Sequence, residues 1–191
     1  MSYHFYALLS RMKVIRRWGL MLNTTPENVA EHTLMTALLA HALALIGRDV
    51  YGRDTDPDAC AARALFHDCG EILTGDLPTP VKYWNPALRD AYRELERYNV
   101  ERLERLVPDE LRPALSECLR PADGDTGRYV GAADKLSAHI KCLEELRQGN
   151  NEFKLAAAQT LRKVEEMRME EADYFIAHFL PSFTLTLDEL E

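Results

Sequence analysis

The stretch FHDCGEILTGDLPTPVKYWN, residues 66–85, places a histidine and an aspartate side by side in an otherwise apolar, alanine-rich segment. We expect one helix over residues 56–75, because Asp56 and Pro57 are typical of a helix start and Gly75 of a helix end. The loop after Gly75 contains an aspartate and two prolines, so its backbone is restricted. A charged pair on an apolar helix beside such a loop indicates a functional site.

The rest of the chain is also patterned as helices. A helix over residues 24–47 has a threonine cap, Pro26 in its first turn and Gly47 at its end. Further helices are expected over residues 86–108, 108–119 and 128–149, and from Asn151 towards Pro181, with an irregular or briefly extended tail at 182–191. No window alternates as a strand does. We therefore predict an all-α single domain over residues 1–191, with about six to eight helices.

The composition excludes several classes of protein. With 47% hydrophobic and 28% charged residues, the chain is typical of a soluble globular protein. The most apolar segment, residues 36–47, is too short to cross a bilayer, and the amino terminus has no secretory signal. Four cysteines without a paired spacing favour reduced thiols. These features predict a cytoplasmic protein that does not bind a membrane, and the net charge of −8 disfavours nucleic acid as a partner.

Four side chains form a candidate metal site. His32, His67, Asp68 and Asp134 all lie in expected helices at positions suited to burial. Taken singly, a histidine on an apolar face is more often a hydrogen-bonded core residue, and an aspartate often caps a helix or pairs with arginine. As a set, the four would leave costly unsatisfied charges without a cation or pairing partners. Imidazole and carboxylate ligands suit Mn²⁺, Co²⁺, Fe²⁺ or Zn²⁺ better than Ca²⁺.

The pattern of His32, His67-Asp68 and Asp134 resembles the signature of the HD-domain metal-dependent phosphohydrolases. The surrounding segments resemble the YfbR-type 5′-deoxynucleotidases of that group, and the likeness spans almost the whole chain. Those segments are RRWGLM (16–21), ENVAEHT (27–33), residues 66–85, IKCLEELRQGNNEF (140–153) and DYFIAHFLPSFTLTLDEL (173–190). The resemblance implies an HD-domain helical bundle that hydrolyses deoxyribonucleoside 5′-monophosphates to deoxynucleoside and phosphate. It also implies a homodimer, for which the aromatic-rich carboxyl-terminal helix is a plausible interface.

By this resemblance a divalent cation, Co²⁺, Mn²⁺ or similar, is held by His32, His67, Asp68 and Asp134. Such a cation polarises a phosphate oxygen and activates a water molecule at neutral pH. Glu71 lies on the same side of the expected helix as His67 and Asp68, and it resembles the acid/base residue of the family. Asp68 is also expected to act in catalysis, and Asp68 and His32 to contact the substrate. Without the resemblance, a helical glutamate at this spacing is usually just solvated.

The resemblance further assigns substrate contacts to two segments. Arg17 and Trp18, near the end of the first expected helix, resemble a pair that orients the phosphate and packs against the nucleoside; Arg17 is also expected to act in catalysis. Taken alone, RRW is more often a surface pair beside a buried anchor. The rigid loop of Asp76, Leu77, Pro78 and Thr79 resembles a substrate-binding segment, with Asp76 accepting from a sugar hydroxyl. Preference for deoxyribose would arise if this loop and Trp18 leave no room for a 2′ hydroxyl.

Two alternative functions remain open. HD domains also hydrolyse nucleoside triphosphates, guanosine polyphosphates and cyclic dinucleotides, although a triphosphate would need more cationic groups around Arg17 than the sequence indicates. A regulatory or scaffolding module could keep a metal site for stability, but such a site needs neither Glu71 nor Arg17. One departure from the family concerns Cys69 and Gly70, where relatives commonly carry Ala-Ser. Gly70 would loosen the helix, and Cys69 could be oxidised or add a soft ligand.

Overall fold

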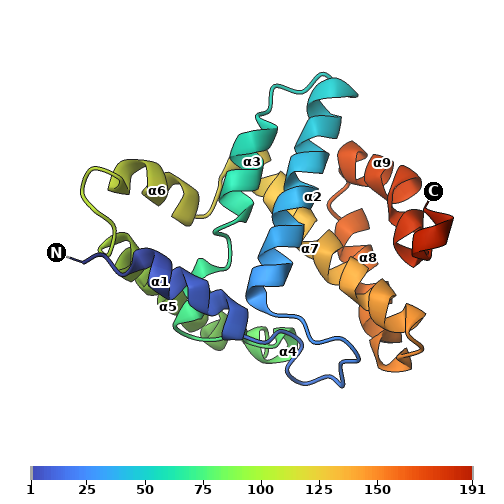
Figure 1. The fold of residues 1–191 in the computed structure, drawn as a ribbon, viewed down its shortest axis with the longest axis horizontal. Helices are drawn as coiled ribbons and strands as arrows, with labels where there is room; N and C mark the ends of the chain where they lie inside the picture. The colour runs from blue at the N-terminus through green and yellow to red at the C-terminus, as the bar shows by residue number, and fades with distance from the viewer. Residues whose placement is uncertain (1, 191) are drawn as a thin grey trace.

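The computed structural model describes residues 2–190, and this part of the chain is helical throughout, with no named strand (Figure 1). The α-helices are α1 (Phe5–Leu9), α2 (Val29–Asp49), α3 (Pro57–Ala64), α4 (Thr79–Lys82), α5 (Pro86–Glu104), α6 (Arg112–Leu119), α7 (Gly124–Arg147), α8 (Lys154–Glu165) and α9 (Glu170–His178). Short 3-10 helices are η1 (Ser10–Val14), η2 (Cys69–Ile72), η3 (Asn151–Phe153), η4 (Leu180–Thr184) and η5 (Leu187–Glu189). The all-α prediction is confirmed, but the described residues hold nine α-helices rather than six to eight. Met1 and Glu191, the two ends of the predicted domain, lie outside the described residues.

The main core surrounds α2, which runs through the middle of the molecule against α3 and α7 (Figure 1). Leu43 on α2 and Leu136 on α7 are fully buried there, and Val164 on α8 and Phe175 on α9 close the far side. A smaller apolar cluster joins Phe5 of α1 to η2 and α5. Because α2 and α7 cross in the core, residues about 100 positions apart in the sequence are brought into contact.

The helix predicted over residues 24–47 is shifted towards the carboxyl end. It begins at Val29, because the Asn28 side chain accepts from the Glu31 backbone N–H while Glu31 accepts from that of Asn28. Thr24 and Pro26 lie in the preceding loop. Gly47 does not end the helix but lies inside it, where a Cβ atom would come within 2.3 Å of the Tyr129 hydroxyl oxygen. The glycine allows α7 to approach α2 closely.

By length and composition α2 would be able to span a membrane, but 56% of its apolar window is buried inside the protein. Packing of α2 in the core therefore accounts for its apolar residues. The predicted starts at Asn85 and Asp56 are confirmed, since both side chains cap their helices and proline follows each.

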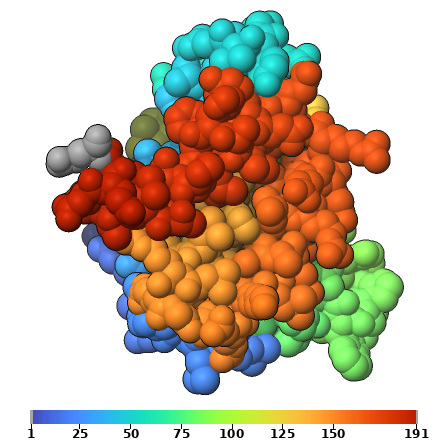
Figure 2. All heavy atoms as spheres, turned by 90° about the vertical axis from the view of Figure 1, so that its right-hand side faces the viewer, coloured from blue at the N-terminus to red at the C-terminus, as the bar shows by residue number. Residues whose placement is uncertain are grey.

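In the carboxyl-terminal half, the helices begin and end at other residues than predicted. The helix predicted over 128–149 begins earlier, at Gly124, and Gly149 follows its end with a φ of +83°. The helix predicted from Asn151 towards Pro181 is divided into α8 and α9 at Arg168, whose φ is +50°. The tail forms the 3-10 turns η4 and η5 on the molecular face shown in Figure 2, and η4 packs against α7 and α9.

Candidate active site

The segment FHDCGE was predicted to continue the preceding helix, but it does not. Helix α3 ends at Ala64, residues 65–68 form a turn, and η2 follows. The Nδ1 atom of His67 lies 2.7 Å from the Ala64 carbonyl oxygen, and Asn99 on α5 donates to the Gly70 carbonyl oxygen at 3.1 Å. These contacts satisfy backbone groups that a continuous helix would satisfy internally. The turn changes the directions in which His67 and Asp68 project.

Three of the four predicted metal ligands come together at this turn. The Nε2 atoms of His32 and His67 lie 3.6 and 3.1 Å from the same Asp68 carboxylate oxygen, and one ligand atom from each residue fits within 4.8 Å of the others. The opposite ring atom, Nδ1, contacts the Ser137 hydroxyl in His32 and a backbone carbonyl in His67. The buried Nε2 of His67 has no hydrogen-bond partner among the described residues. Two imidazoles held at Nδ1, with Nε2 turned to one carboxylate, fit a divalent cation.

The fourth predicted ligand, Asp134 on α7, lies beside this cluster. Its Oδ1 atom is 3.2 Å from Nε2 of His32. Its side chain is 41% exposed, so the expectation that all four ligands are buried is wrong for this residue. Asp134 occupies the solvent side of the cluster, where a ligand can enter.

The charges in the cluster depend strongly on one another. Burial lowers the pKa of His67, but the charge of the nearby Asp68 carboxylate outweighs it and raises that pKa to about 9. Burial raises the pKa of Asp68, but His67 reverses this and brings it to about 2. Partial loss of solvation raises the pKa of Asp134, but its hydrogen bond to His32 outweighs this and lowers that pKa. Both carboxylates are therefore ionised at neutral pH, and positive charge is stabilised between them.

Arg17 and Trp18 were predicted near the end of the first helix. They lie instead in the loop after η1, where Trp18 has a φ of +58°. Nη1 of Arg17 is 3.6 Å from Oδ2 of Asp68, so this guanidinium borders the metal cluster. Burial lowers the pKa of Arg17, but the charges of Asp68 and Glu27 raise it above its usual value. Glu27 accepts from both residues of the pair, at Arg17 Nε and Trp18 Nε1.

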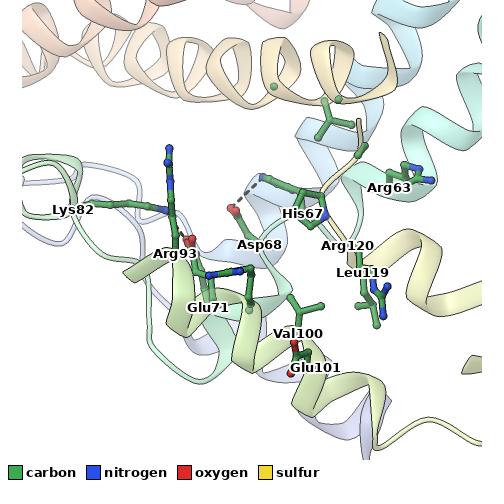
Figure 3. Close-up of a pocket in the computed structure, with 18 of the residues that line it drawn as sticks. Arg63, His67, Asp68, Glu71, Lys82, Arg93, Val100, Glu101, Leu119 and Arg120 are labelled. Atoms are coloured by element: carbon green, nitrogen blue, oxygen red, sulfur yellow. Dashed lines mark hydrogen bonds and ion pairs between the residues drawn. The ribbon is translucent and has the colours of Figure 1, made fainter. Parts of the chain in front are cut away.

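A cavity of about 1000 Å³ opens on the other side of the cluster and is lined by His67, Asp68 and Glu71 (Figure 3). Arg17, Trp18 and the loop of Asp76 to Thr79 are not among its lining residues. Lys82 and Arg93 project from one side and Arg63 and Arg120 from the opposite side. With Arg97, the wall carries five basic side chains, which the sequence did not indicate.

Glu71 is buried at the base of this cavity, although it projects from η2 rather than from the expected helix. Its Oε2 atom has no hydrogen-bond partner among the residues that the structure describes. Burial raises the pKa of Glu71, and the charges of Asp68 and Asp76 raise it further, to about 9. Its role as the acid/base residue, which the family resemblance implies, stays a prediction.

Cys69 has a structural explanation, whereas nothing in the part of the chain that the structure describes requires a glycine at position 70. Cys69 is fully buried in the smaller apolar cluster with Phe5 and Leu103, outside the group of ligand atoms, and burial raises its thiol pKa to about 12. The structure therefore gives no support to the soft ligand considered from the sequence. A Cβ atom at Gly70 would lie 3.4 Å from the Glu96 carbonyl oxygen, which is ordinary contact.

Sequence reasoning missed Glu27 and Ser137, which contact site residues without lying in the metal motif. Glu27 opens the segment ENVAEHT, so its place in that segment was the available signal. Ser137 lies three residues after Asp134, on the neighbouring turn of the same helix, which was a weaker signal.

Solved structures share this architecture. An HD-domain phosphohydrolase from Listeria innocua matches with a TM-score of 0.82 and 26% identity, over 94% of this chain and 88% of the other. An HD phosphohydrolase from cyanophage S-2L, solved with deoxyadenosine and one catalytic Zn²⁺ ion, matches with a TM-score of 0.64 and 20% identity, over 92% and 96%. The second likeness concerns the fold alone. Fold and cluster together define an HD-domain phosphohydrolase.

Sequence comparisons narrow this class. Residues 4–183 match the YfbR-like 5′-deoxynucleotidase family. A 5′-deoxynucleotidase from Erwinia tasmaniensis is 45% identical over 98% of this chain and 96% of the relative, and the YfbR enzyme of Salmonella paratyphi B is 46% identical over 98% and 95%. The chain belongs to the YfbR-like 5′-deoxynucleotidase family. The predicted family and enzyme class, a phosphoric monoester hydrolase, are confirmed.

Proposed function

We propose that the protein hydrolyses deoxyribonucleoside 5′-monophosphates to deoxynucleoside and phosphate, with a divalent cation held by His32, His67, Asp68 and Asp134. The observation that carries this proposal is the shared direction of the two imidazole Nε2 atoms towards one oxygen of Asp68. Two imidazoles and two carboxylates suit a borderline cation such as Co²⁺ or Mn²⁺. The Erwinia and Salmonella relatives, both 5′-deoxynucleotidases, support the substrate class.

When bound, the cation supplies a Lewis acid that polarises a phosphate oxygen and lowers the pKa of a water molecule. Arg17, next to Asp68, binds and orients the phosphate, since a guanidinium matches two phosphate oxygens. Because its pKa is raised to about 9, the carboxyl of Glu71 holds a proton at neutral pH. It donates this proton to the 5′ oxygen as the bond between that oxygen and phosphorus breaks, and it takes a proton back from the attacking water, whose oxygen forms the new bond to phosphorus. Its unpartnered oxygen is free for this role.

Specificity for the sugar is proposed for Trp18 and for the loop of Asp76, Leu77, Pro78 and Thr79, with His32 and Asp68 beside the phosphate. Asp76 is half-buried, and its carboxylate interacts with the charge of Arg17. Thr79 begins α4, and Pro78 before it stiffens the loop. A stiff wall rejects an added 2′ hydroxyl by shape more strongly than a flexible one.

One assay tests the activity. Metal-free protein is resupplied with Co²⁺, Mn²⁺ or Mg²⁺ and given matched deoxy- and ribonucleoside monophosphates, then triphosphates. We expect phosphate release that needs metal and favours the deoxy monophosphates. If no deoxy monophosphate releases phosphate with any metal, the proposal is wrong.

Two variants separate ligation from proton transfer. Asp68→Ala should lose bound metal and turnover together, whereas Glu71→Ala should keep metal and lose turnover by about 10² to 10⁴-fold. Glu101→Ala is a matched control, because this carboxylate also lines the cavity but lies away from the cluster. Full activity in Glu71→Ala would contradict its assigned role.

A nucleotide with more phosphates is a second candidate substrate. The sequence indicated few cationic groups near the site, yet the cavity wall carries Arg63, Lys82, Arg93, Arg97 and Arg120. Several of these are already paired, Lys82 with Glu96 and Arg120 with Glu104, which favours the monophosphate. If the same assay shows faster turnover of a triphosphate than of the matching deoxy monophosphate, the triphosphate becomes the preferred substrate.

The homodimer and the cytoplasmic location also belong to the proposal. Phe179 and Leu187 are exposed near the carboxyl end, whereas Phe175 is buried in the core. All four cysteines are free thiols, which suits a reducing compartment. Sedimentation at several concentrations would test the dimer; a purely monomeric protein would contradict it.

A further inference from the structure

One carboxylate faces both predicted substrate side chains in the loop after η1. Oε2 of Glu27 accepts from the indole Nε1 of Trp18 at 2.8 Å and from Nε of Arg17 at 3.2 Å. The other oxygen of Glu27 lies 4.0 Å from Nδ1 of His32. The side chain is only 12% exposed, so water competes little for these contacts.

The backbone of Glu27 contacts the same loop. Its carbonyl oxygen accepts from the Arg17 N–H at 3.0 Å, and the neighbouring residues Arg16 and Asn28 form an antiparallel bridge. The loop is thus closed at its base by the residue whose side chain holds its two functional groups. A change in the Glu27 side chain can therefore be tested while the backbone contact remains.

Trp18 needs such support because its backbone is strained. A φ of +58° is unfavourable for a bulky side chain and persists only when the surroundings hold it. The indole ring packs on Phe153 with centroids 5.3 Å apart, and Asn23 donates to the Trp18 carbonyl oxygen. The indole N–H has Glu27 as its acceptor.

We propose that Glu27 is a positioning residue that fixes the Arg17 guanidinium and the Trp18 indole, and that it thereby sets phosphate affinity and the preference for deoxyribose. This inference rests on the proposed function. Glu27 occupies Nε of Arg17 and thereby directs the terminal nitrogens, of which Nη1 borders Asp68, towards the metal cluster where phosphate would bind. It also holds the indole plane, so the wall that excludes a 2′ hydroxyl keeps its position.

The kinetic test uses Glu27→Ala and Glu27→Gln with deoxyadenosine and adenosine 5′-monophosphates. Glu27→Ala should raise KM for the deoxy substrate about tenfold and lower the ratio of kcat/KM for deoxy over ribo substrate by about tenfold, with metal still bound. Glu27→Gln keeps an acceptor oxygen for the indole but loses the charge facing Arg17. It should restore most of the discrimination while KM stays raised.

A spectroscopic arm works without turnover. The chain has two tryptophans, and Trp84 is 78% exposed, so Trp84→Phe leaves Trp18 as the only tryptophan, which is excited at wavelengths that the tyrosines do not absorb. In this background Glu27→Ala should shift emission to longer wavelength and increase quenching by acrylamide, and Glu27→Gln should not. The control is Glu152→Ala, which removes another carboxylate that holds this loop, at Leu22 N–H, without touching Trp18.

The outcomes are distinct. If Glu27→Ala leaves emission unchanged, or shifts emission but leaves the deoxy to ribo ratio unchanged, the positioning role is overturned. The same holds if Glu152→Ala lowers the ratio as much as Glu27→Ala. If the unaltered protein hydrolyses no deoxy monophosphate, the proposed function fails, while the emission arm still reports whether Glu27 holds Trp18.

Discussion

At the scale of single residues, α7 contributes Ser137 to the site in addition to Asp134. Its buried hydroxyl lies 3.0 Å from Nδ1 of His32 and so holds the ring with Nε2 towards Asp68. Groups in this position usually change metal affinity by about 10- to 100-fold when removed. We expect Ser137→Ala to weaken Co²⁺ binding about tenfold, measured by calorimetric titration of metal-free protein.

Thr33→Val provides the control for that measurement. Thr33 is next to His32, and its buried hydroxyl has no hydrogen-bond partner among residues 2–190. Its replacement should leave Co²⁺ affinity unchanged, because no contact to the imidazole is lost. Equal affinity in the serine variant and the unaltered protein would show that the hydroxyl does not orient His32.

The same scale shows which site residues a sequence can reveal. Histidine and aspartate on apolar helices stand out, because burying them without partners is costly; His32, His67 and Asp68 do converge. A serine in an alanine-rich helix carries no comparable signal. The role of Glu27 depends on the path of the loop that carries Trp18 at positive φ. That path is set by contacts between residues distant in the sequence, so the sequence pattern does not reveal it.

At the scale of elements, helix starts that are capped by neighbouring side chains could be predicted from the sequence. Helix breaks that depend on residues distant in the sequence could not. Asp56 and Asn85 cap their helices through their own side chains, so a few adjacent residues contain the whole signal. The segment that follows α3 is held instead by Asn99, which donates to the carbonyl oxygen of Gly70, 29 positions earlier in the sequence. Thr24 was a plausible cap, but its N–H is bonded to Glu145 on α7.

The crossing of α2 and α7 gives an element-scale prediction. Inside a helix, Gly→Ala normally stabilises by about 1 kcal/mol. At Gly47 the added Cβ would lie 2.3 Å from Oη of Tyr129, which is held in place by its bond to Glu171. Overpacking costs about 1 to 3 kcal/mol, so Gly47→Ala should lower the free energy of unfolding, measured in urea.

Gly131→Ala is the matched control. Gly131 lies on α7, and the nearest atoms to its added Cβ are 3.9 Å away, at the flexible ends of Lys135 and Met167. Here the higher helix propensity of alanine should dominate, so the free energy of unfolding should rise by about 0.5 to 1 kcal/mol. The same sign of change in both variants would contradict the close helix contact at Gly47.

At the scale of the whole molecule, a buried ionic network joins the amino-terminal loop to the end of α7. Glu145 is fully buried and accepts from Lys141 and from the backbone N–H groups of Thr24 and Thr25. Lys141 donates in turn to the Thr25 carbonyl oxygen, and Asn150 donates to Glu145. Because the loop from Thr24 leads back to Arg17 and Trp18, this network connects overall stability to the placement of the site.

The network predicts how stability depends on pH. Burial raises the pKa of Glu145, but its bonds to Lys141 and the two backbone N–H groups outweigh it and lower that pKa to about 2. An unfolded glutamate titrates near 4.5, so the contribution is complete above about pH 4.5 and is lost as pH falls towards 2. Glu145→Gln leaves Lys141 buried without its carboxylate and should cost about 3 to 5 kcal/mol near neutral pH.

Urea unfolding of both proteins between pH 7 and 2.5 measures this difference. The gap in free energy of unfolding should stay constant down to about pH 4.5 and then narrow, because the unaltered protein loses what the variant already lacks. Glu166→Gln, an exposed carboxylate outside this network, should follow the unaltered protein throughout. A gap that stays constant to pH 2.5 would mean that the Glu145 carboxylate is not stabilised by the fold, and that packing alone holds the loop on α7.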